Sequence, residues 1–244
     1  MRKFKIVRRL AFLLVVLASH ADANVVLSST RMIFPANEQE VTIKMTNEGN
    51  VPALIQAWVD TGDPNAAPEK IDIPFMLTPS MFRMEPGKGQ SLRLIYTDRV
   101  LPTDKESLFW LNVLEIPPKA VGDDRNKIQL AIRSRIKVMF RPEGLSGSAD
   151  EAPGQVKWEL TREGAKYAVK ATNPTPYVVN LGSIELEAGE QKYDAGFGYI
   201  LPGATQTFPV ESLRTMPTTG IKIKFSGIND WGASKAAEKD INIK

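Results

Sequence analysis

The sequence contains no cysteine and only one histidine, His20. Without thiols the chain can form no disulfide bond, no Cys–His nucleophile pair and no cysteine-ligated zinc site. His20 lies in an N-terminal segment that we expect to be removed, so Ser-His-Asp triads and histidine metal sites are excluded as well. Stability must therefore come from hydrophobic cores, and a hydrolase that uses two carboxylates is the enzyme class left open.

The first 23 residues have the three parts of a secretory signal peptide. A basic start is followed by an apolar run at residues 10–17 and by Ala-Asp-Ala at residues 21–23, which is a small-x-small cleavage site. The apolar run is too short to span a membrane. The sequence therefore predicts export, removal of residues 1–23, a mature chain that starts at Asn24, and no integral membrane segment.

The charge of the chain changes once this segment is set aside. The whole sequence has 31 Lys and Arg against 28 Asp and Glu, whereas residues 24–244 retain 26 and 27, a formal charge of −1. The basic excess thus belongs to the targeting signal and gives no indication of nucleic-acid binding. The carboxylates show no ligand spacing typical of a metal site, and we predict neither a metal nor a cofactor.

Short alternating runs bounded by turn residues fill the rest of the chain. The pattern predicts strands at residues 25–34, 40–47, 53–60, 91–98, 107–116, 127–140, 156–164, 166–173, 176–187, 206–210 and 220–230. No segment shows a sustained helical period with caps at both ends, and 17 Pro and 17 Gly interrupt the whole length. The runs predict an all-β protein built from sandwiches, with Trp58 and Trp110 as core aromatics.

A change in composition predicts two domains. Gly, Pro, Ser and acidic residues dominate residues 141–155, where Leu145 is the one large apolar side chain. This composition is typical of an exposed connection between domains. We therefore predict one domain over residues 24–146 and a second, smaller all-β domain over residues 152–244.

One predicted strand is unusually long. In residues 126–142 (NKIQLAIRSRIKVMFRP) the even positions from 128 to 140 read Ile, Leu, Ile, Ser, Ile, Val and Phe, as in a strand with one buried face. Such a strand would span roughly 40 Å, about twice the usual length. Either all these side chains face their own core, or Ile128, Leu130 and Ile132 lie partly outside it and contact a partner. The length favours the second interpretation.

Two sets of charged residues are candidates for a site, although single charges near strand ends are most often solvated. Arg31 and Lys137 would together grip a carboxylate, the first through its planar guanidinium and the second as a point charge. Glu106, Arg141 and Asp230 each adjoin a strand end or a turn, and ion pairs among them would bridge the two domains. Spacing alone does not show that the members of either set meet.

Several segments resemble the periplasmic pilus chaperones of the chaperone-usher pathway, the PapD-like family. In the family's order they are LSSTRMIF (27–34), ALIQAWVD (53–60), RMEPG (83–87), KESLFWLNVLEIPP (105–118), RIKVMFRP (135–142), TNPTPY (172–177) and GINDWG (227–232). They are distributed along nearly the whole of residues 24–244, so the match is specific.

The resemblance implies two immunoglobulin-like sandwiches in a boomerang arrangement, with a binding cleft between them, in a periplasmic protein. Family chaperones hold a pilin subunit that lacks the last strand of its own sandwich, lend it a strand, and deliver it to an outer-membrane usher. By position, Ile128, Leu130 and Ile132 correspond to the alternating donor residues of that strand. The extra length of the strand would then serve as a temporary core for another protein.

The resemblance also assigns roles to the two charged sets. Arg31 and Lys137 correspond to the pair that anchors the C-terminal carboxylate of the pilin. The interdomain ion-pair network of the family corresponds to Glu106, Arg141 and Asp230.

Three questions stay open from the sequence. Strict alternation places Lys137 on the opposite face from Ile132, so we expect either a bulge between them or a lysine that reaches the cleft from the other side. The alternatives to a chaperone are an exported Ig-like fibre subunit or adhesin and a glycan-active enzyme, for which no carboxylate pair is evident. A homodimer that covers the edge of the free chaperone is also open.

Overall fold

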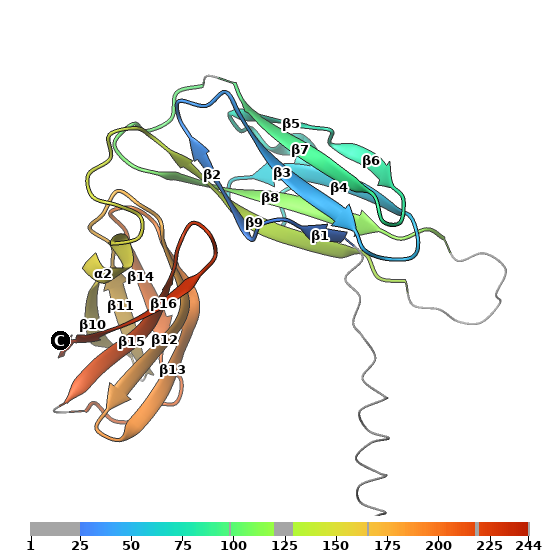
Figure 1. Cartoon of the computed structure of the whole chain (residues 1–244). Helices are drawn as coiled ribbons and strands as arrows, with labels where there is room; N and C mark the ends of the chain where they lie inside the picture. The colour runs from blue at the N-terminus through green and yellow to red at the C-terminus, as the bar shows by residue number, and fades with distance from the viewer. Residues whose placement is uncertain (1–24, 98, 120–128, 165, 218–219, 244) are drawn as a thin grey trace, which may run out of the picture.

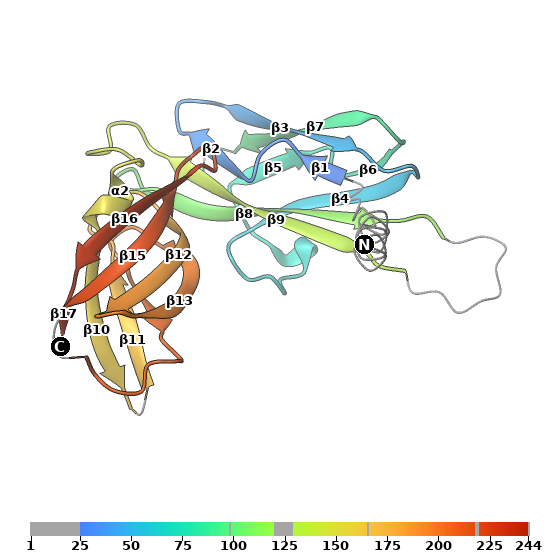
Figure 2. The ribbon, with the colours of Figure 1, turned by 60° about the horizontal axis from the view of Figure 1, so that its bottom comes forward.

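The protein, as a computed structural model, is described here for residues 25–243 except 98, 120–128, 165 and 218–219. Figure 1 shows two lobes of strands that meet at one end and lie at an angle, which gives the chain a bent outline. Figure 2 shows the same two lobes after a turn of 60°. The predicted all-β class with two sandwich domains is confirmed.

The first domain packs two sheets against each other. One has the strand order β1-β3-β7-β5 and the other β2-β9-β8-β4-β6. The strands are β1 (Val25–Leu27), β2 (Arg31–Pro35), β3 (Glu40–Asn47), β4 (Ala53–Asp60), β5 (Phe75–Thr78), β6 (Met81–Met84), β7 (Gly89–Tyr96), β8 (Ser107–Ile116) and β9 (Ile132–Arg141). A short 3-10 helix, η1 (Pro68–Lys70), lies between β4 and β5.

The second domain also has two sheets, of order β14-β11-β10-β17 and β13-β12-β15-β16. Its elements are α2 (Ala152–Gln155), β10 (Lys157–Glu163), β11 (Lys166–Thr172), β12 (Val179–Ala188), β13 (Gln191–Ile200), β14 (Thr205–Pro209), β15 (Ile221–Ile228), β16 (Ser234–Asp240) and β17 (Asn242–Ile243). Helix is minor, as predicted. Among the described residues, no helix is long and apolar enough to cross a membrane.

Each domain has its own hydrophobic core, because alternate residues of its strands point inward. Ile55 and Val59 of β4 are buried in the first domain, and Ile223 and Phe225 of β15 are buried in the second. The two clusters of buried residues share no member. The chain contains no cysteine, so apolar burial in these two cores stabilises the domains without a disulfide.

The strand predicted at residues 25–34 is two strands in different sheets. β1 ends at Leu27 and pairs with β3, whereas β2 starts at Arg31 and pairs with β9. Between them the Ser29 hydroxyl donates to the Arg31 carbonyl at 2.6 Å, and the Arg31 N–H donates back at 3.4 Å. Such local side-chain bonds compete with the strand ladder, and here they accompany the crossing from one sheet to the other.

Sequence reasoning missed five strands, and each is an edge strand. β5, β6, β13, β16 and the two-residue β17 all stand at the end of the strand order of their sheet. β13 (QKYDAGFGYI) contains two glycines and β16 (SKAAEKD) has no large apolar side chain. An edge strand contacts one neighbour only, so its sequence carries a weak alternation signal.

The connection between the domains is attached to the second domain at a few points. The Tyr177 hydroxyl donates to the carbonyls of Leu145 and Gly147, at 3.4 and 3.1 Å. The Leu145 side chain packs against the core of the second domain, and Ala152 belongs to that core. The connection predicted over residues 141–155 is thus largely exposed, but Leu145 and Ala152 anchor it to the second domain.

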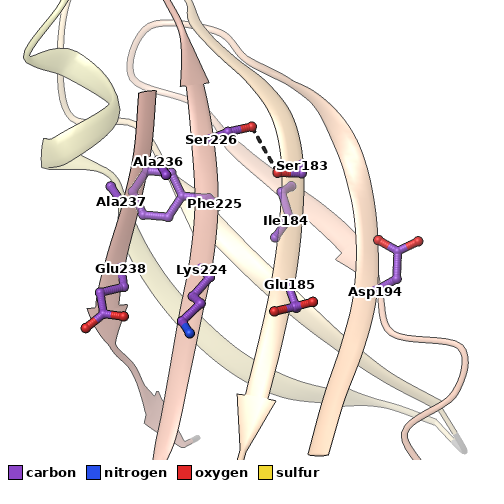
Figure 3. A pocket seen from close by; sticks show the side chains of 10 residues that line it. All are labelled: Ser183, Ile184, Glu185, Asp194, Lys224, Phe225, Ser226, Ala236, Ala237 and Glu238. Carbon is purple, nitrogen blue, oxygen red and sulfur yellow. Dashed lines mark hydrogen bonds between the residues drawn. The ribbon is translucent and has the colours of Figure 1, made fainter. Parts of the chain in front are cut away.

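The second domain has a hollow of about 580 Å³ over the sheet β13-β12-β15-β16. Figure 3 shows side chains of all four strands around it, with a hydrogen bond of 2.9 Å between the hydroxyls of Ser183 and Ser226. None of the residues that the sequence nominates for a site lines this hollow. The candidate site lies elsewhere, where β9 meets the second domain.

Candidate functional site

β9 has one edge that is only partly covered. On one side it pairs with β8 from Ile132 to Phe140, but on the other it pairs with β2 only from Lys137 to Arg141. In the described part of the chain, no strand pairs with this second side over residues 132–136. We call residues 132–136 the open edge. Unpaired backbone groups on such an edge are a template for an added strand.

β9 starts later than the sequence predicts, at Ile132 instead of residue 127. Glu115 of β8 faces Ile132, so a continued register would place Leu130 and the residue before it opposite Pro117 and Pro118. Proline has no N–H to donate to a ladder. The carbonyls of both prolines instead accept from the Gln129 side chain, at 3.1 and 2.6 Å.

Two apolar side chains at the start of this segment are exposed to solvent. Leu130 is 71% and Ile132 is 51% exposed, whereas Ile136 and Val138 on the same face are buried in the core. The interpretation in which every even position faces its own core is therefore wrong for Leu130 and Ile132. Ile128, the third residue of the predicted set, lies outside the described residues.

Arg31, the first residue of β2, lies directly beside Lys137 in the parallel pairing of β2 with β9. Arg31 is buried, and one of its terminal nitrogens donates to the Ile228 carbonyl at 3.3 Å. Its Nε is also buried, without a hydrogen-bond partner among the described residues. Burial lowers the pKa of Arg31, and the negative charge of Asp230 partly opposes this shift. A buried donor without an acceptor is costly and points to an external acceptor.

Lys137 reaches toward the second domain. Its ammonium donates to Asn180 Oδ1 at 2.6 Å and lies 5.5 and 4.6 Å from the ring centroids of Trp110 and Tyr199. Burial, and then the charge of Arg31, lower the pKa of Lys137 to about 8. The register of β9 against β8 runs from residue 132 to 140 without a shift, so the expected bulge is absent. The lysine reaches the junction from the face opposite Ile132.

Arg31 and Lys137, which we call the cation pair, have no salt-bridge partner among the described residues, although the charge of Asp230 acts on Arg31. Neither forms a salt bridge with a carboxylate of the described residues, whereas the nearby Arg135 and Arg141 both do. Two neighbouring cations, one buried and one partly buried, raise each other's free energy unless an anion joins them. The pair is therefore suited to an anionic ligand, and the Arg31 guanidinium suits a carboxylate.

The structure brings Glu106, Arg141 and Asp230 together at the domain junction. Arg141 donates to Glu106 at 2.6 Å and to both oxygens of Asp230 at 2.7 and 2.9 Å. The buried Glu106 carboxylate also accepts from the Val178 N–H of the second domain at 2.6 Å. Burial raises the pKa of Glu106, although Val178 and Arg141 oppose this shift. The three side chains thus tie the end of β9 to the second domain.

Two family models match this chain in sequence. The "Pili and flagellar-assembly chaperone, PapD N-terminal domain" matches residues 24–146. The "Pili assembly chaperone PapD, C-terminal domain" matches residues 151–239. The chain belongs to the PapD family of pilus-assembly chaperones. This membership agrees with the resemblance seen in the sequence, and it decides against a glycan-active enzyme.

Individual relatives of this PapD-family chain cover nearly its full length. The probable fimbrial chaperone YadV of Escherichia coli (strain K12) is 39% identical over 89% of each chain. The chaperone protein FimB/FhaD of Bordetella pertussis is 40% identical over 91% of this chain and 90% of its own. The crystal structure of YadV has a TM-score of 0.76 and covers 88% of this chain and 98% of its own, at 37% identity.

A further solved structure contains a chaperone together with a pilin. It is the complex of the Salmonella enterica SafA pilin with the SafB chaperone, and the matched chain has a TM-score of 0.72 at 26% identity. The match covers 91% of this chain and 98% of that chain.

The two tryptophans predicted for the core of the PapD-family N-terminal domain lie outside it. Trp58 of β4 and Trp110 of β8 stand at positions between buried residues and are only partly buried, so the prediction is wrong. The Arg133 guanidinium lies 6.0 Å from the ring centroid of Trp58, and that of Arg135 lies 4.2 Å from Trp110. The outer face of this sheet is therefore lined by alternating aromatic rings and cations.

Sequence reasoning also missed an ion pair on this face. Arg135 forms a salt bridge with Asp60, which is buried and also accepts from the Asn112 side chain at 2.7 Å. Although burial opposes the shift, hydrogen bonds from Arg135, Asn112 and Gly62 lower the pKa of Asp60. Arg135 is thus neutralised within the domain, unlike Lys137 two residues later. No sequence signal distinguishes these two cations, because Arg135 and Lys137 stand two residues apart in the same alternating run and face the same side of the strand.

Asp230→Ala is expected to lower the free energy of unfolding by about 1–3 kcal/mol. The substitution removes one carboxylate of the interdomain network and leaves Arg141 only partly paired at a half-buried site. Urea unfolding measures this loss. The matched control is Glu211→Ala, which breaks the exposed pair with Lys166 and should cost less than about 1 kcal/mol. Equal losses in the two variants would contradict a special role for the interdomain pair.

Proposed function

We propose that this protein is a periplasmic chaperone that lends the first half of β9, with the segment before it, to a pilin subunit lacking a strand of its own sandwich. We call that subunit the client. The observation that carries the proposal is an open edge that starts at exposed Ile132, two residues after exposed Leu130, and ends at two neighbouring cations. The donor set includes Ile128 from the sequence pattern. The solved complex of the related SafB chaperone with a pilin supports this function.

The direction of the added strand follows from β2. β2 runs parallel to β9 and starts at Arg31, beside Lys137, so a strand added along the open edge lies in line with β2 and must stop there. A strand parallel to β9 would bring its C-terminal carboxylate to the cation pair. An antiparallel strand would bring an ammonium group there, which like charges disfavour. The cation pair therefore sets both the direction and the register of the client strand.

Apolar burial gives the added strand its stabilising effect. Covering Leu130 and Ile132 is worth roughly 1–2 kcal/mol each, since each side chain still exposes half or more of its surface. Backbone pairing along the open edge adds affinity without demanding a client sequence. A whole domain is stable by only about 5–15 kcal/mol, so these contributions suffice to keep an incomplete subunit folded.

The interdomain ion pairs would hold the cleft in shape for the client. Arg141 follows directly on the buried part of β9, and it joins that strand to Glu106 and to Asp230 of the second domain. A network of three partly buried charges resists bending better than one exposed pair. Glu106, Arg141 and Asp230 therefore have a supporting function in this proposal, and they do not contact the client.

The place of this protein in the pathway is part of the same proposal. The signal peptide predicted at residues 1–23 supports export to the periplasm. Delivery of the client to an outer-membrane usher is proposed from family membership. In the absence of a client, a second copy of the chain could cover the open edge and form a self-capping homodimer.

Cell fractionation separates this proposal from the alternative of an exported Ig-like fibre subunit or adhesin. For a chaperone, osmotic shock should release the protein in soluble form, and affinity purification from that fraction should yield a pilin in equal amount. A fibre subunit would instead remain with the cells as a high-molecular-weight polymer. Recovery of the chain only in such polymers would contradict the proposal.

Client binding is expected to weaken as the pH rises above about 8. In the free protein the pKa of Lys137 is about 8, because burial and Arg31 disfavour the ammonium. A bound carboxylate favours the ammonium and raises this pKa, so above pH 8 binding takes up a proton. The affinity should then fall by up to about tenfold per pH unit.

Calorimetric titration in buffers of different ionisation enthalpy measures this proton uptake. It should be near zero at pH 7 and approach one proton per client at pH 9. Lys137→Arg is the control, because a guanidinium stays charged over this range. Equal pH profiles for the wild type and Lys137→Arg would contradict binding through the Lys137 ammonium.

A further inference from the structure

The Lys137 ammonium is enclosed by groups from both domains. Trp110 comes from β8 of the first domain, whereas Asn180 of β12 and Tyr199 of β13 come from the second and face each other across their two strands. The Trp110 and Tyr199 rings meet edge to face, with centroids 5.8 Å apart. All three groups are neutral, so they locate the ammonium without cancelling its charge.

Asn180 is built to present its oxygen to Lys137. The residue is only 4% exposed, and its Nδ2 donates to the Val178 carbonyl at 3.4 Å and to the Met139 sulfur at 3.6 Å. These two bonds use the amide N–H groups and leave Oδ1 for the lysine, at 2.6 Å. A short hydrogen bond from a charged donor to a fixed acceptor restricts an otherwise flexible side chain.

We propose that Asn180 is a positioning residue of the carboxylate site: the second domain holds the Lys137 ammonium in place through a neutral amide oxygen, so that the site stays cationic and selects a strand with a free C-terminal carboxylate. This inference rests on the proposed function. If Asn180 has this role, the second domain takes part in selecting the client and does not only border the cleft. One N–H of the ammonium serves Asn180, and two remain for a client carboxylate.

Neutrality at this position is a specific requirement. Aspartate has nearly the same shape as asparagine, so Asn180→Asp would place a carboxylate beside Lys137 and supply the counter-ion internally. The client carboxylate would then meet a neutralised lysine and a repelling carboxylate. Asn180→Ala removes the acceptor and leaves Lys137 charged but without a fixed position. The two variants therefore separate the effect of charge from that of positioning.

The test uses one synthetic peptide in two forms, because the natural client is unidentified. A nine-residue peptide of alternating apolar and polar residues carries either a free C-terminal carboxylate or a C-terminal amide, and NMR titration of the full-length mature protein gives both Kd values. In the wild type the acid should bind at least about tenfold more tightly than the amide. Asn180→Asp should reduce this preference below about threefold, and Asn180→Ala should reduce it to an intermediate value.

Asn50→Asp is the matched control, since it makes the same change of charge at an exposed loop residue and should keep the wild-type preference. A second readout is the pKa of Lys137, followed by NMR of the side chain. It should rise in Asn180→Asp, fall in Asn180→Ala and stay unchanged in Asn50→Asp. A residue that only fills space would leave this pKa where it is. Circular dichroism checks folding, and Asn180→Ala carries the test if Asn180→Asp is unfolded.

The outcomes distinguish this inference from the proposed function. If wild-type protein prefers the acid and Asn180→Asp prefers it equally, the positioning role of Asn180 is overturned and the carboxylate site remains. If the wild type binds acid and amide equally, the carboxylate site itself is overturned, and the inference with it.

Discussion

Lys137→Glu is expected to lower client affinity by at least about 100-fold, because it replaces the cation that we propose for the client carboxylate with a like charge. The new carboxylate would also pair with Arg31, which lies beside position 137 in the register of β2 and β9. Arg31→Asp should act in the same direction. The measurement is the amount of client that co-purifies from the periplasm, supported by the Kd for the free-acid peptide.

The free Lys137→Glu protein should remain folded. Burial without a carboxylate partner disfavours the Lys137 ammonium, so its removal takes away an unfavourable contribution to the folded state. Lys88→Glu, on an exposed turn, provides the same change of charge away from the site and should leave client binding intact. Wild-type recovery of the client by either cation-pair variant would remove the carboxylate contact from the account.

Leu130→Ala combined with Ile132→Ala should reduce client affinity by about 30- to 1000-fold, given roughly 1–2 kcal/mol for each lost apolar contact. Both side chains are exposed in the free protein, so thermal unfolding should change little. Met76→Ala is a suitable control, because Met76 is 55% exposed on β5 of the other sheet. Equal effects of the double variant and the control on client binding would show that these two residues are not donor residues.

The sequence predicted those parts of the structure that depend on alternation along one strand. In β9 the even positions from Ile136 to Phe140 are buried as predicted, and Leu130 and Ile132 are exposed as the longer-than-usual pattern indicated. The adjacency of Arg31 to Lys137 depends on how two distant strands pair, which spacing along the chain does not encode. Their residue types suggested a shared carboxylate site, but only the resemblance to a family indicated that they meet before the register was known.

Features that depend on the second domain were beyond the sequence. Asn180 is one of many polar residues in a strand, and its contact with Lys137 exists only because the domains meet at this angle. Trp110 was assigned to a core on the ground that large aromatics are usually buried. In the structure it supports a cation at the domain junction instead, which residue type alone does not distinguish.

The late start of β9 follows from proline chemistry, which the sequence does contain. Pro117 and Pro118 stand where a longer ladder between β8 and β9 would need N–H donors, and β9 starts only at Ile132. The Gln129 side chain instead donates to the two proline carbonyls. Within the described residues, Leu130 therefore precedes the strand and keeps its side chain exposed.

Hydrogen exchange of the backbone amides tests the central claim most directly, which is that another chain adds a strand to the open edge of β9. The exchange of a peptide covering residues 129–136 is measured in the free protein and in the purified complex with its client. We predict that exchange of this peptide slows by at least about tenfold in the complex, as new interstrand hydrogen bonds form. Unchanged exchange at residues 129–136, with protection elsewhere on the chain, would contradict the account.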